Sequence, residues 1–306
     1  MNAPRLWAVV GATGTGKTAL SLEIAEALGR RGHAAEVVNA DAMQLYRWME
    51  IGTAKLPPSE HRGIPHHLFD ELDVAEEATV AWYQPRARAA VEAIHARGAD
   101  AILVGGSGLY VSAVLFDFRF PPRDPALRAA LEAEWEAGGG PHMVARLREA
   151  DPEAAARIDA RNPRRVIRAL EVIAQGEGTH GGALPGAPVA WHPDTRIVGV
   201  ARDRAELVTR LDERVERMWR DGIVAEAVAL RARGLDDGVT ARRAIGYAQA
   251  LAQHDGVLSE PDAIAQAQAL TRRYARRQVS WFRRYDDVAW VDAVDAATAE
   301  ALVDAR

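Results

Sequence analysis

Eight residues near the N-terminus form a phosphate-binding motif. Residues 11–18 read GATGTGKT and match G-x-x-x-x-G-K-[ST] at every position. In such a loop the glycines let backbone N–H groups converge on phosphate oxygens, and the start of the following helix adds positive potential. Lys17 is expected to neutralise a terminal phosphate, and the Thr18 hydroxyl to bind Mg²⁺. The motif predicts a diphosphate or triphosphate site made of Gly11, Ala12, Thr13, Gly14, Thr15, Gly16, Lys17 and Thr18.

Asp41 is the second candidate for a catalytic or metal-binding residue. It follows residues 36–39, EVVN, which are predicted to form a strand that ends just before it. Ligands of open α/β sheets bind at the carboxyl ends of strands, so Asp41 is expected near the phosphates, as a metal contact or a general base. A helix N-cap or turn is the alternative role. The strand 99–104 ends in two glycines and lacks the acid that usually organises Mg²⁺ in an ATPase or GTPase.

Apolar periodicity places these groups on an α/β fold. Residues 5–10, 36–39 and 99–104 are predicted strands with helical patterns between them, which is the alternation of a parallel sheet covered on both faces. After residue 116 the pattern changes to successive helices over 123–175. The stretch 176–188 is rich in Gly and Pro and is expected to be a mobile loop.

The strand pattern returns at 195–200, and amphipathic helices follow it. The sequence therefore predicts a P-loop NTPase-like parallel sheet flanked by helices, with an inserted all-helical domain. The catalytic core is expected to comprise 1–116 and 196–306, and the insertion 117–195.

Composition narrows the class of protein. The 306 residues include no cysteine, which excludes disulfides, thiolate catalysis and Cys-based zinc sites. No apolar run is long enough to cross a bilayer, so a cytoplasmic protein without membrane contact is expected. The net charge is −5, but 161–168 and 271–284 are rich in arginine, as phosphate contacts of a nucleic acid require. A solvated helix face is the alternative for each run.

Lys17 and Lys55 are the only lysines, and the other 36 basic residues are arginine. A lysine retained in such a composition suggests a need for a compact ammonium group. Lys55 could reach a diphosphate or an RNA, or it could lie at the surface without a ligand.

Seven separated segments resemble tRNA dimethylallyltransferases, also called tRNA isopentenyltransferases. The segments keep the family's order and span nearly the whole chain. They are GATGTGKT at 11–18, NADAMQLYRWMEIGTAK at 39–55, HHLFD at 66–70, LVGGSGLYVSAV at 103–114, NPRRVIRALEV at 162–172, RRAIGYAQ at 242–249 and TRRYARRQVSWFRR at 271–284.

The resemblance implies transfer of a dimethylallyl group from dimethylallyl diphosphate to the exocyclic N6 amine of the adenosine immediately 3′ of a tRNA anticodon. Thr13, Lys17 and Thr18 would hold the diphosphate with Mg²⁺, Arg243 would clamp it from the C-terminal side, and Asp41 would be the general base. The anticodon stem-loop would contact Asp41, Ala42, Met43, Gln44, Ser107, Arg128, Arg164, Arg165, Val166, Ile167 and Arg168. Nothing in the sequence demands a dimer, and a monomer is expected.

Two positions depart from the family pattern. Ala42 replaces the usual serine after the base, and Ser107 replaces a threonine. Neither change removes a reacting group. The absence of a Cys/His zinc module near the C-terminus is typical of a compact bacterial-type enzyme.

Three other functions fit parts of the sequence. A small-molecule kinase would use the same loop for ATP. A prenyltransferase acting on free adenine nucleotides would share the mechanism but not need the arginine-rich insertion. A non-enzymatic RNA-binding module would leave Lys17, Thr18 and Asp41 unexplained.

The pair His66-His67 is predicted to make structural hydrogen bonds, and Tyr274, Trp281 and Phe282 are predicted to lie in the core.

Overall fold

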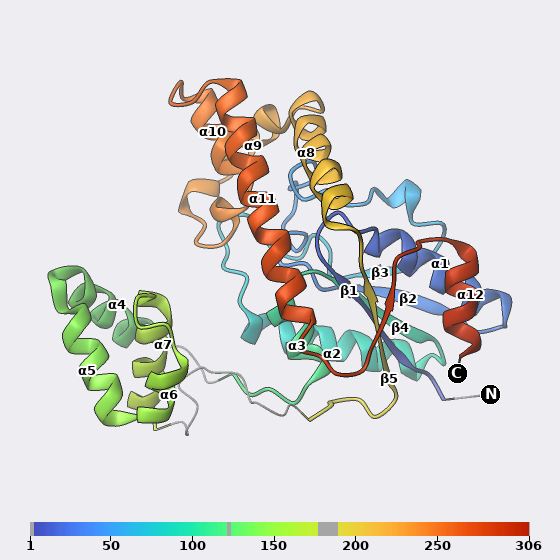
Figure 1. Ribbon diagram of the computed structural model, residues 1–306, viewed down its shortest axis with the longest axis horizontal. Coiled ribbons are helices and arrows are strands. Elements are labelled where there is room, and N and C mark those ends of the chain that lie inside the picture. Colours follow the sequence, from blue (N-terminus) through green and yellow to red (C-terminus); the bar gives the residue numbers. More distant parts are fainter. Residues whose placement is uncertain (1–2, 121–123, 177–188, 306) are drawn as a thin grey trace. The chain divides into compact units, whose positions relative to one another are not determined.

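Six parallel strands form the central sheet of the computed structural model, which describes residues 3–120, 124–176 and 189–305 (Figure 1). The strands lie in the order β3-β2-β4-β1-β5-β6. Their bounds are β1 Leu6–Gly11, β2 Ala35–Asn39, β3 His66–His67, β4 Asp100–Gly105, β5 Thr195–Val200 and β6 Val288–Val291. Every residue of β1 and β4 is buried, because helices cover both faces of a parallel sheet. The predicted fold class is confirmed.

The helices of the sheet-bearing part pack against these strands and against one another (Figure 1). They are α1 Lys17–Arg30, α2 Val80–Ala96, α3 Gly108–Leu115, α8 Arg204–Arg220, α9 Ile223–Arg231, α10 Tyr247–His254, α11 Glu260–Phe282 and α12 Ala296–Asp304. Short 3₁₀ turns occur at η1 Pro58–Glu60, η3 Leu235–Asp237 and η4 Ala241–Arg243. Within the described residues, every helix is too short or too polar to span a lipid bilayer.

The apolar core lies between the sheet and α1 with α12. Trp7 and Val9 of β1 and Ile102 of β4 pack there against Leu20 and Ile24 of α1. Alternate residues of one strand point to the same face, so the apolar residues at 7 and 9 reach the same layer. This packing holds the start of α1, and with it the phosphate loop, at the carboxyl end of β1.

A smaller helical unit comprises Phe116–Ala190, whereas Met1–Leu115 and Trp191–Arg306 form the sheet-bearing unit. The insertion predicted from the sequence was 117–195. The helices of the smaller unit are α4 Pro125–Glu134, α5 Gly140–Ala150, α6 Pro152–Arg157 and α7 Pro163–Ala174, with a π-helical turn, η2 Trp135–Gly139, between the first two.

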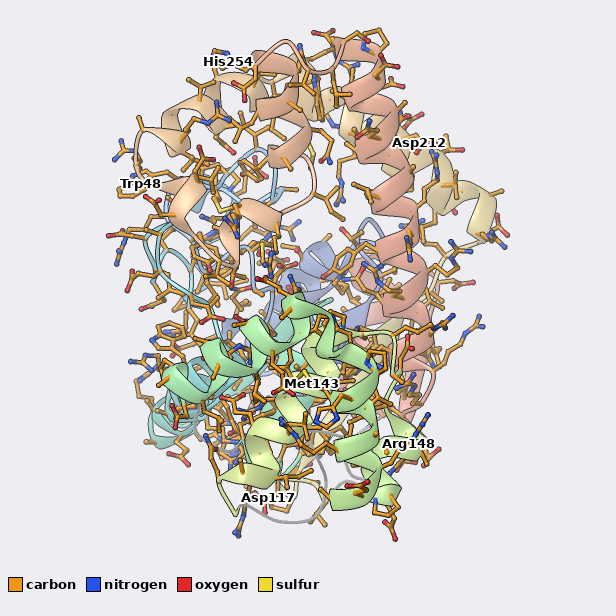
Figure 2. All side chains as sticks on the ribbon, turned by 90° about the vertical axis from the view of Figure 1, so that its left-hand side faces the viewer. Trp48, Asp117, Met143, Arg148, Asp212 and His254 are labelled. Carbon is orange, nitrogen blue, oxygen red and sulfur yellow. The ribbon has the colours of Figure 1, made fainter. Side chains whose placement is uncertain are left out.

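The helical unit has its own core. Met143 is fully buried with Leu131, Leu147, Val166 and Leu170, whereas Arg148 lies on the outside of α5 (Figure 2). Prolines at the first position of α4, α6 and α7 and at the second position of α5 suit helix starts, because a proline there loses no intrahelical hydrogen bond. The Gly/Pro-rich stretch predicted as a loop lies, apart from Gly176, outside the described residues.

Candidate active site

The phosphate loop lies between β1 and α1, as the motif predicts. Gly16 adopts φ 103° at the N-cap of α1, a conformation that glycine accepts without strain. A Cβ atom at Gly11 would lie 2.6 Å from the Val200 carbonyl oxygen of β5, so the close approach of these strands also requires glycine. The Ala12 carbonyl oxygen accepts hydrogen bonds from Lys17 Nζ at 2.7 Å and Thr15 Oγ1 at 2.9 Å. These contacts fold the loop around the start of the helix.

Two arginines of the C-terminal half hold the same loop from outside. Arg202 Nε donates to the Thr15 carbonyl oxygen at 2.9 Å, and Arg210 Nε donates to the Gly14 carbonyl oxygen at 3.3 Å. Carbonyls engaged in this way are turned away from a bound anion, which favours amide groups facing it. Sequence reasoning missed both arginines, since neither belongs to a phosphate motif.

Asp41 lies just beyond the end of β2. Its backbone N–H donates to Asn39 Oδ1 at 2.8 Å, and its carboxylate Oδ1 accepts the Met43 N–H at 3.0 Å. Asn39 is itself fixed, because its Nδ2 donates to the Leu68 carbonyl oxygen at 2.8 Å. The carboxylate therefore has a defined orientation, with one oxygen taken by a turn of the type that aspartate favours.

Ser107 connects the end of β4 with this segment. Its Oγ lies 3.4 Å from the Ala42 N–H nitrogen, which donates to it, and 3.5 Å from the Tyr274 hydroxyl of α11. The carboxyl ends of β1, β4 and β2 thus carry the phosphate loop, Ser107 and Asp41 respectively. This edge of the sheet is where ligands of the fold class bind.

Positive charge is concentrated beside Asp41. Burial lowers the pKa of Lys17 to about 8; the charge of Asp41 opposes this lowering and that of Arg214 adds to it. Burial likewise lowers the pKa of the Arg214 guanidinium, again with Asp41 opposing. The pKa of Tyr274 is raised to about 12, first by burial and then by the charge of Asp41. Two cations share one nearby carboxylate, so an anion bound here would gain a favourable field.

Arg214 is the cation that sequence reasoning did not find. Its Nε is buried and has no hydrogen-bond partner among the described residues. It occurs on the buried face of α8 that also presents Leu211, Val215 and Met218. An arginine at a position expected to be apolar was the available signal, because buried charges are costly unless they have a partner.

A hollow of about 390 Å³ adjoins Arg214. Its walls come from the loop after β2 and from α8: Glu50, Ile51, Ala54, Lys55, Pro57, Arg214, Arg217, Met218 and Asp221. The structure thus provides open space next to the guanidinium of Arg214, whose Nε lacks a partner among the described residues.

Arg243, the predicted clamp, lies in η4 and is exposed. The turn that carries it packs against η3 and α10. The arginine that shares the field of Lys17 and Asp41 is Arg214 of α8. A role for Arg243 at the diphosphate stays a prediction.

The predicted RNA contacts of the helical unit divide into exposed and internal groups. Arg164 and Arg165 are exposed at the start of α7, whereas Val166 and Ile167 are buried in the unit's core. Arg128 and Arg168 both form ion pairs with the fully buried Glu171, at 3.4 and 2.9 Å. The exposed pair is therefore the part of this motif best placed for a phosphate backbone.

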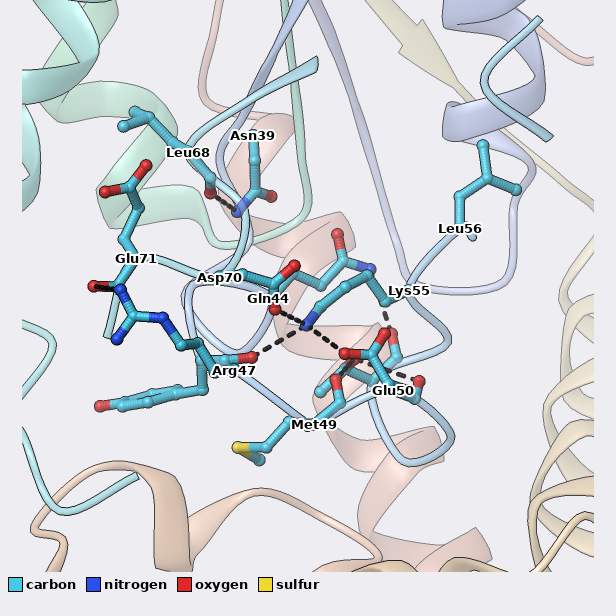
Figure 3. A network of polar contacts seen from close by, with 12 residues as sticks. Asn39, Gln44, Arg47, Met49, Glu50, Lys55, Leu56, Leu68, Asp70 and Glu71 are labelled. Atoms are coloured by element: carbon cyan, nitrogen blue, oxygen red, sulfur yellow. Dashed lines mark hydrogen bonds and ion pairs between the residues drawn. The ribbon is translucent and has the colours of Figure 1, made fainter. Parts of the chain in front are cut away.

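Gln44 and Lys55 belong to one network that braces the loop after β2 (Figure 3). Lys55 Nζ donates to the Tyr46 carbonyl oxygen at 2.9 Å, to Glu50 Oε1 at 3.0 Å and to Asp70 Oδ1 at 2.6 Å. Gln44 Nε2 donates to the Thr53 carbonyl oxygen at 3.1 Å. All three ammonium protons of Lys55 are used, so its role within the chain is to hold this loop together.

Two further expectations concern histidines and aromatic residues. His67 Nε2 lies 2.6 Å from Glu36 Oε2, and His66 Nδ1 lies 2.8 Å from the Ile64 carbonyl oxygen, as structural hydrogen bonds require. Across residues 3–120, 124–176 and 189–305, no three His, Asp or Glu side chains form a metal-binding group. Phe282 is fully buried, as expected of a core residue, whereas Tyr274 and Trp281 are only partly buried. Trp281 Nε1 donates to Ser112 Oγ at 3.1 Å.

The chain is similar to known proteins over nearly its whole length. A family model described as IPP transferase matches residues 44–285. The tRNA dimethylallyltransferase of Clavibacter sepedonicus is 59% identical over 97% of this chain and 96% of its own. The crystal structure of a tRNA isopentenylpyrophosphate transferase from Bacillus halodurans has a TM-score of 0.70 at 36% identity, covering 98% and 96% of the two chains. A eukaryotic dimethylallyltransferase acting on tRNA has a TM-score of 0.79 at 27% identity, covering 99% of this chain and 77% of that one.

Proposed function

The chain belongs to the IPP transferase family, and we propose that it moves a dimethylallyl group from dimethylallyl diphosphate to tRNA. The acceptor in this proposal is the exocyclic N6 amine of the adenosine immediately 3′ of the anticodon. The observation that carries it is the meeting of a phosphate loop with the carboxylate Asp41 at one edge of the sheet, next to the cations Lys17 and Arg214.

The phosphate loop stabilises the leaving diphosphate. As the bond between the allylic carbon and oxygen breaks, negative charge builds on the bridging oxygen. Lys17, Arg214 and the loop amides are fixed before the reaction, so they stabilise that charge without a reorganisation cost. Thr13 and Thr18 add hydroxyl groups around the same anion. The unpartnered Arg214 Nε supports this role, because a bound diphosphate would give it an acceptor.

Asp41 receives the proton from the acceptor. The exocyclic amine of adenine is a weak nucleophile, because its lone pair is delocalised into the ring. A carboxylate within hydrogen-bond reach takes the amine proton as the new C–N bond forms. Asp41 suits this role since its position is held by Asn39 and the turn to Met43.

Mg²⁺ is proposed to arrive with the diphosphate. Proteins commonly hold this ion through one or two side chains together with substrate phosphates, not through a cage of several carboxylates. The exposed Thr18 residue at the start of α1 fits such a shared site. When bound, Mg²⁺ neutralises charge on the diphosphate.

The tRNA is proposed to contact Arg164 and Arg165 of α7 through phosphates, and Met43, Gln44 and Ser107 near the reacting base. Extraction of the target base from its stack costs a few kcal/mol, which these contacts must offset. Because the arginines would contact phosphates, affinity for tRNA should fall steeply with salt concentration.

All these groups come from one chain, and the enzyme is proposed to act as a monomer in the cytoplasm.

Incubation of unmodified tRNA with labelled dimethylallyl diphosphate and Mg²⁺ tests the proposal. We expect label on the adenosine 3′ of the anticodon, no transfer to AMP, and no phosphate transfer from ATP. The Asp41→Asn variant should transfer about 10²-fold more slowly in a single turnover. Label elsewhere in the tRNA, or an unchanged rate for that variant, would show that the acceptor or the base is wrongly assigned.

A further inference from the structure

Gln278 of α11 is a buried polar side chain that joins two loops of the site. Only 4% of its surface is exposed. Its Oε1 accepts the Thr13 N–H at 2.8 Å, and its Nε2 donates to the Gly106 carbonyl oxygen at 2.8 Å. Thr13 follows β1 and Gly106 follows β4, so one amide group connects the phosphate loop to the loop that ends in Ser107.

The backbone of the β4 loop is shaped to accept this amide. A Cβ atom at Gly106 would lie 2.3 Å from Gln278 Nε2 and 3.2 Å from the Gly11 carbonyl oxygen. Any larger residue at 106 would push the Gln278 side chain away. The glycine thus permits the contact, although its φ angle is ordinary.

One helical turn before Gln278, Tyr274 extends the connection to β2. The Tyr274 hydroxyl lies 3.5 Å from Ser107 Oγ, and Ser107 Oγ accepts the Ala42 N–H at 3.4 Å. Residues four apart lie on the same face of a helix. A single face of α11 therefore contacts the loops at the ends of β1 and β4, and through Ser107 the loop at the end of β2.

We propose that Gln278 is a positioning residue for prenyl transfer, which sets the distance between the diphosphate on the phosphate loop and the acceptor beside Asp41. The inference rests on the proposed function. Because the reacting atoms must approach within about 3–3.5 Å, a shift of one loop relative to the other slows the reaction even when both substrates are bound. The Thr13 N–H is directed to Gln278, so the amide also shapes the phosphate loop itself.

The Gln278→Leu variant removes both hydrogen bonds at similar volume. We expect its single-turnover rate with both substrates saturating to fall by about 10- to 100-fold. The dissociation constants for dimethylallyl diphosphate and for tRNA, measured separately, should change by less than about threefold, because neither substrate loses a direct contact. Should this variant fail to fold, Gln278→Met, which keeps the length of the side chain, carries the same test.

Gln268→Leu is the matched control on the same helix. Gln268 Nε2 donates to the Asp212 carbonyl oxygen at 3.3 Å and lies 3.4 Å from Glu216 Oε1, both of α8. The same substitution there removes contacts between helices and none at the strand ends. Its transfer rate should stay within about twofold of wild type.

Gly106→Ala tests the contact from the other side, because it displaces the amide while Gln278 stays in the chain. The double variant should be no slower than the slower single variant, since both changes break one contact. The proposal would be overturned if the rate losses of the two single variants multiplied in the double variant. An unchanged transfer rate in Gln278→Leu, or an equal loss of rate in Gln268→Leu, would overturn it as well. If the wild-type protein transfers no prenyl group, the proposed function fails instead, and the two failures are thereby distinguished.

Discussion

The two lysines of this chain lie in opposite environments. Lys17, at the phosphate loop, donates one hydrogen bond within the chain, to the Ala12 carbonyl oxygen, and forms no ion pair with any carboxylate in the described residues. Lys55, in the loop after β2, donates to one carbonyl and forms ion pairs with Glu50 and Asp70. Its side chain is only 4% exposed.

Lys17 is therefore a cation available to a bound anion, whereas Lys55 is a cation that stabilises the folded chain. Arg214 adds positive charge next to Lys17, and burial lowers the pKa of both groups. The protein thus keeps two incompletely compensated cations together, which costs stability until an anion binds. At Lys55 the protein supplies the compensating charges itself. Four predictions test this contrast, in descending order of expected effect.

The Lys17→Met variant should show the largest effect on catalysis. Loss of a fixed cation next to the leaving diphosphate should lower the single-turnover rate by about 10²- to 10³-fold. Rapid-quench measurement at saturating substrates gives this rate. Lys55→Met is the matched control and should stay within about threefold of wild type. Equal losses in the two variants would remove the distinction between them.

The pH dependence of stability should report the uncompensated charge of Lys17. The folded-state pKa is about 8, below the unfolded value of 10.5. The unfolded chain therefore holds the proton more tightly, and the protein gains stability as pH rises from about 8 towards 10.5. Lys17→Met lacks this penalty and should be about 1–3 kcal/mol more stable than wild type at pH 7.

Urea unfolding of both proteins between pH 7 and pH 9.5 measures that difference, which should shrink as pH rises. Added pyrophosphate with Mg²⁺ should reduce it at pH 7, since the anion compensates the charge. A difference that stays constant across the pH range would show that Lys17 carries no such penalty.

Lys55→Met should mainly affect stability. The substitution leaves Glu50 and Asp70 without their partner and deprives the Tyr46 carbonyl oxygen of its donor. Both carboxylates are about half exposed, so we expect a loss of about 1–3 kcal/mol in the free energy of unfolding, less than for a fully buried pair. Denaturant titration at pH 7 measures it. Unaltered stability would mean that the network does not brace the loop.

Lys55→Arg should give the smallest effect. The charge is kept, but a planar guanidinium does not match three acceptors arranged around a compact ammonium. We expect a loss of about 1 kcal/mol in the free energy of unfolding, with the transfer rate unchanged. The comparison with Lys55→Met separates charge from shape. A loss equal to that of Lys55→Met would show that shape alone decides the site.

The phosphate loop and Asp41 were predictable because both depend on local sequence. The pattern at 11–18 needs only a strand before it and a helix after it, and β1 and α1 provide them. Asp41 follows β2, and the end of a parallel strand already implies the ligand edge. The parallel sheet itself followed from the apolar runs separated by helical patterns.

Arg214 and Gln278 were not predictable from motifs. Each is a polar residue on the buried face of a helix, distant in sequence from the loop it serves. A polar residue within a hydrophobic pattern indicates that its side chain needs a hydrogen-bond or charge partner. The pattern does not indicate which residue is that partner. The sequence also could not distinguish an unpaired Lys17 from a paired Lys55.

The order of residues determined by itself which segments become strands, which loop can cradle phosphate and which carboxylate ends a strand, because these depend on neighbours in the chain. Only the tertiary structure decided which distant side chains complete the site. Parallel strands bring their carboxyl ends together through crossover helices, so Gln278, the partner of Thr13, and Arg214, whose charge acts on Lys17, come from segments far along the chain. Tertiary packing determines these partners, and no local sequence pattern indicates them.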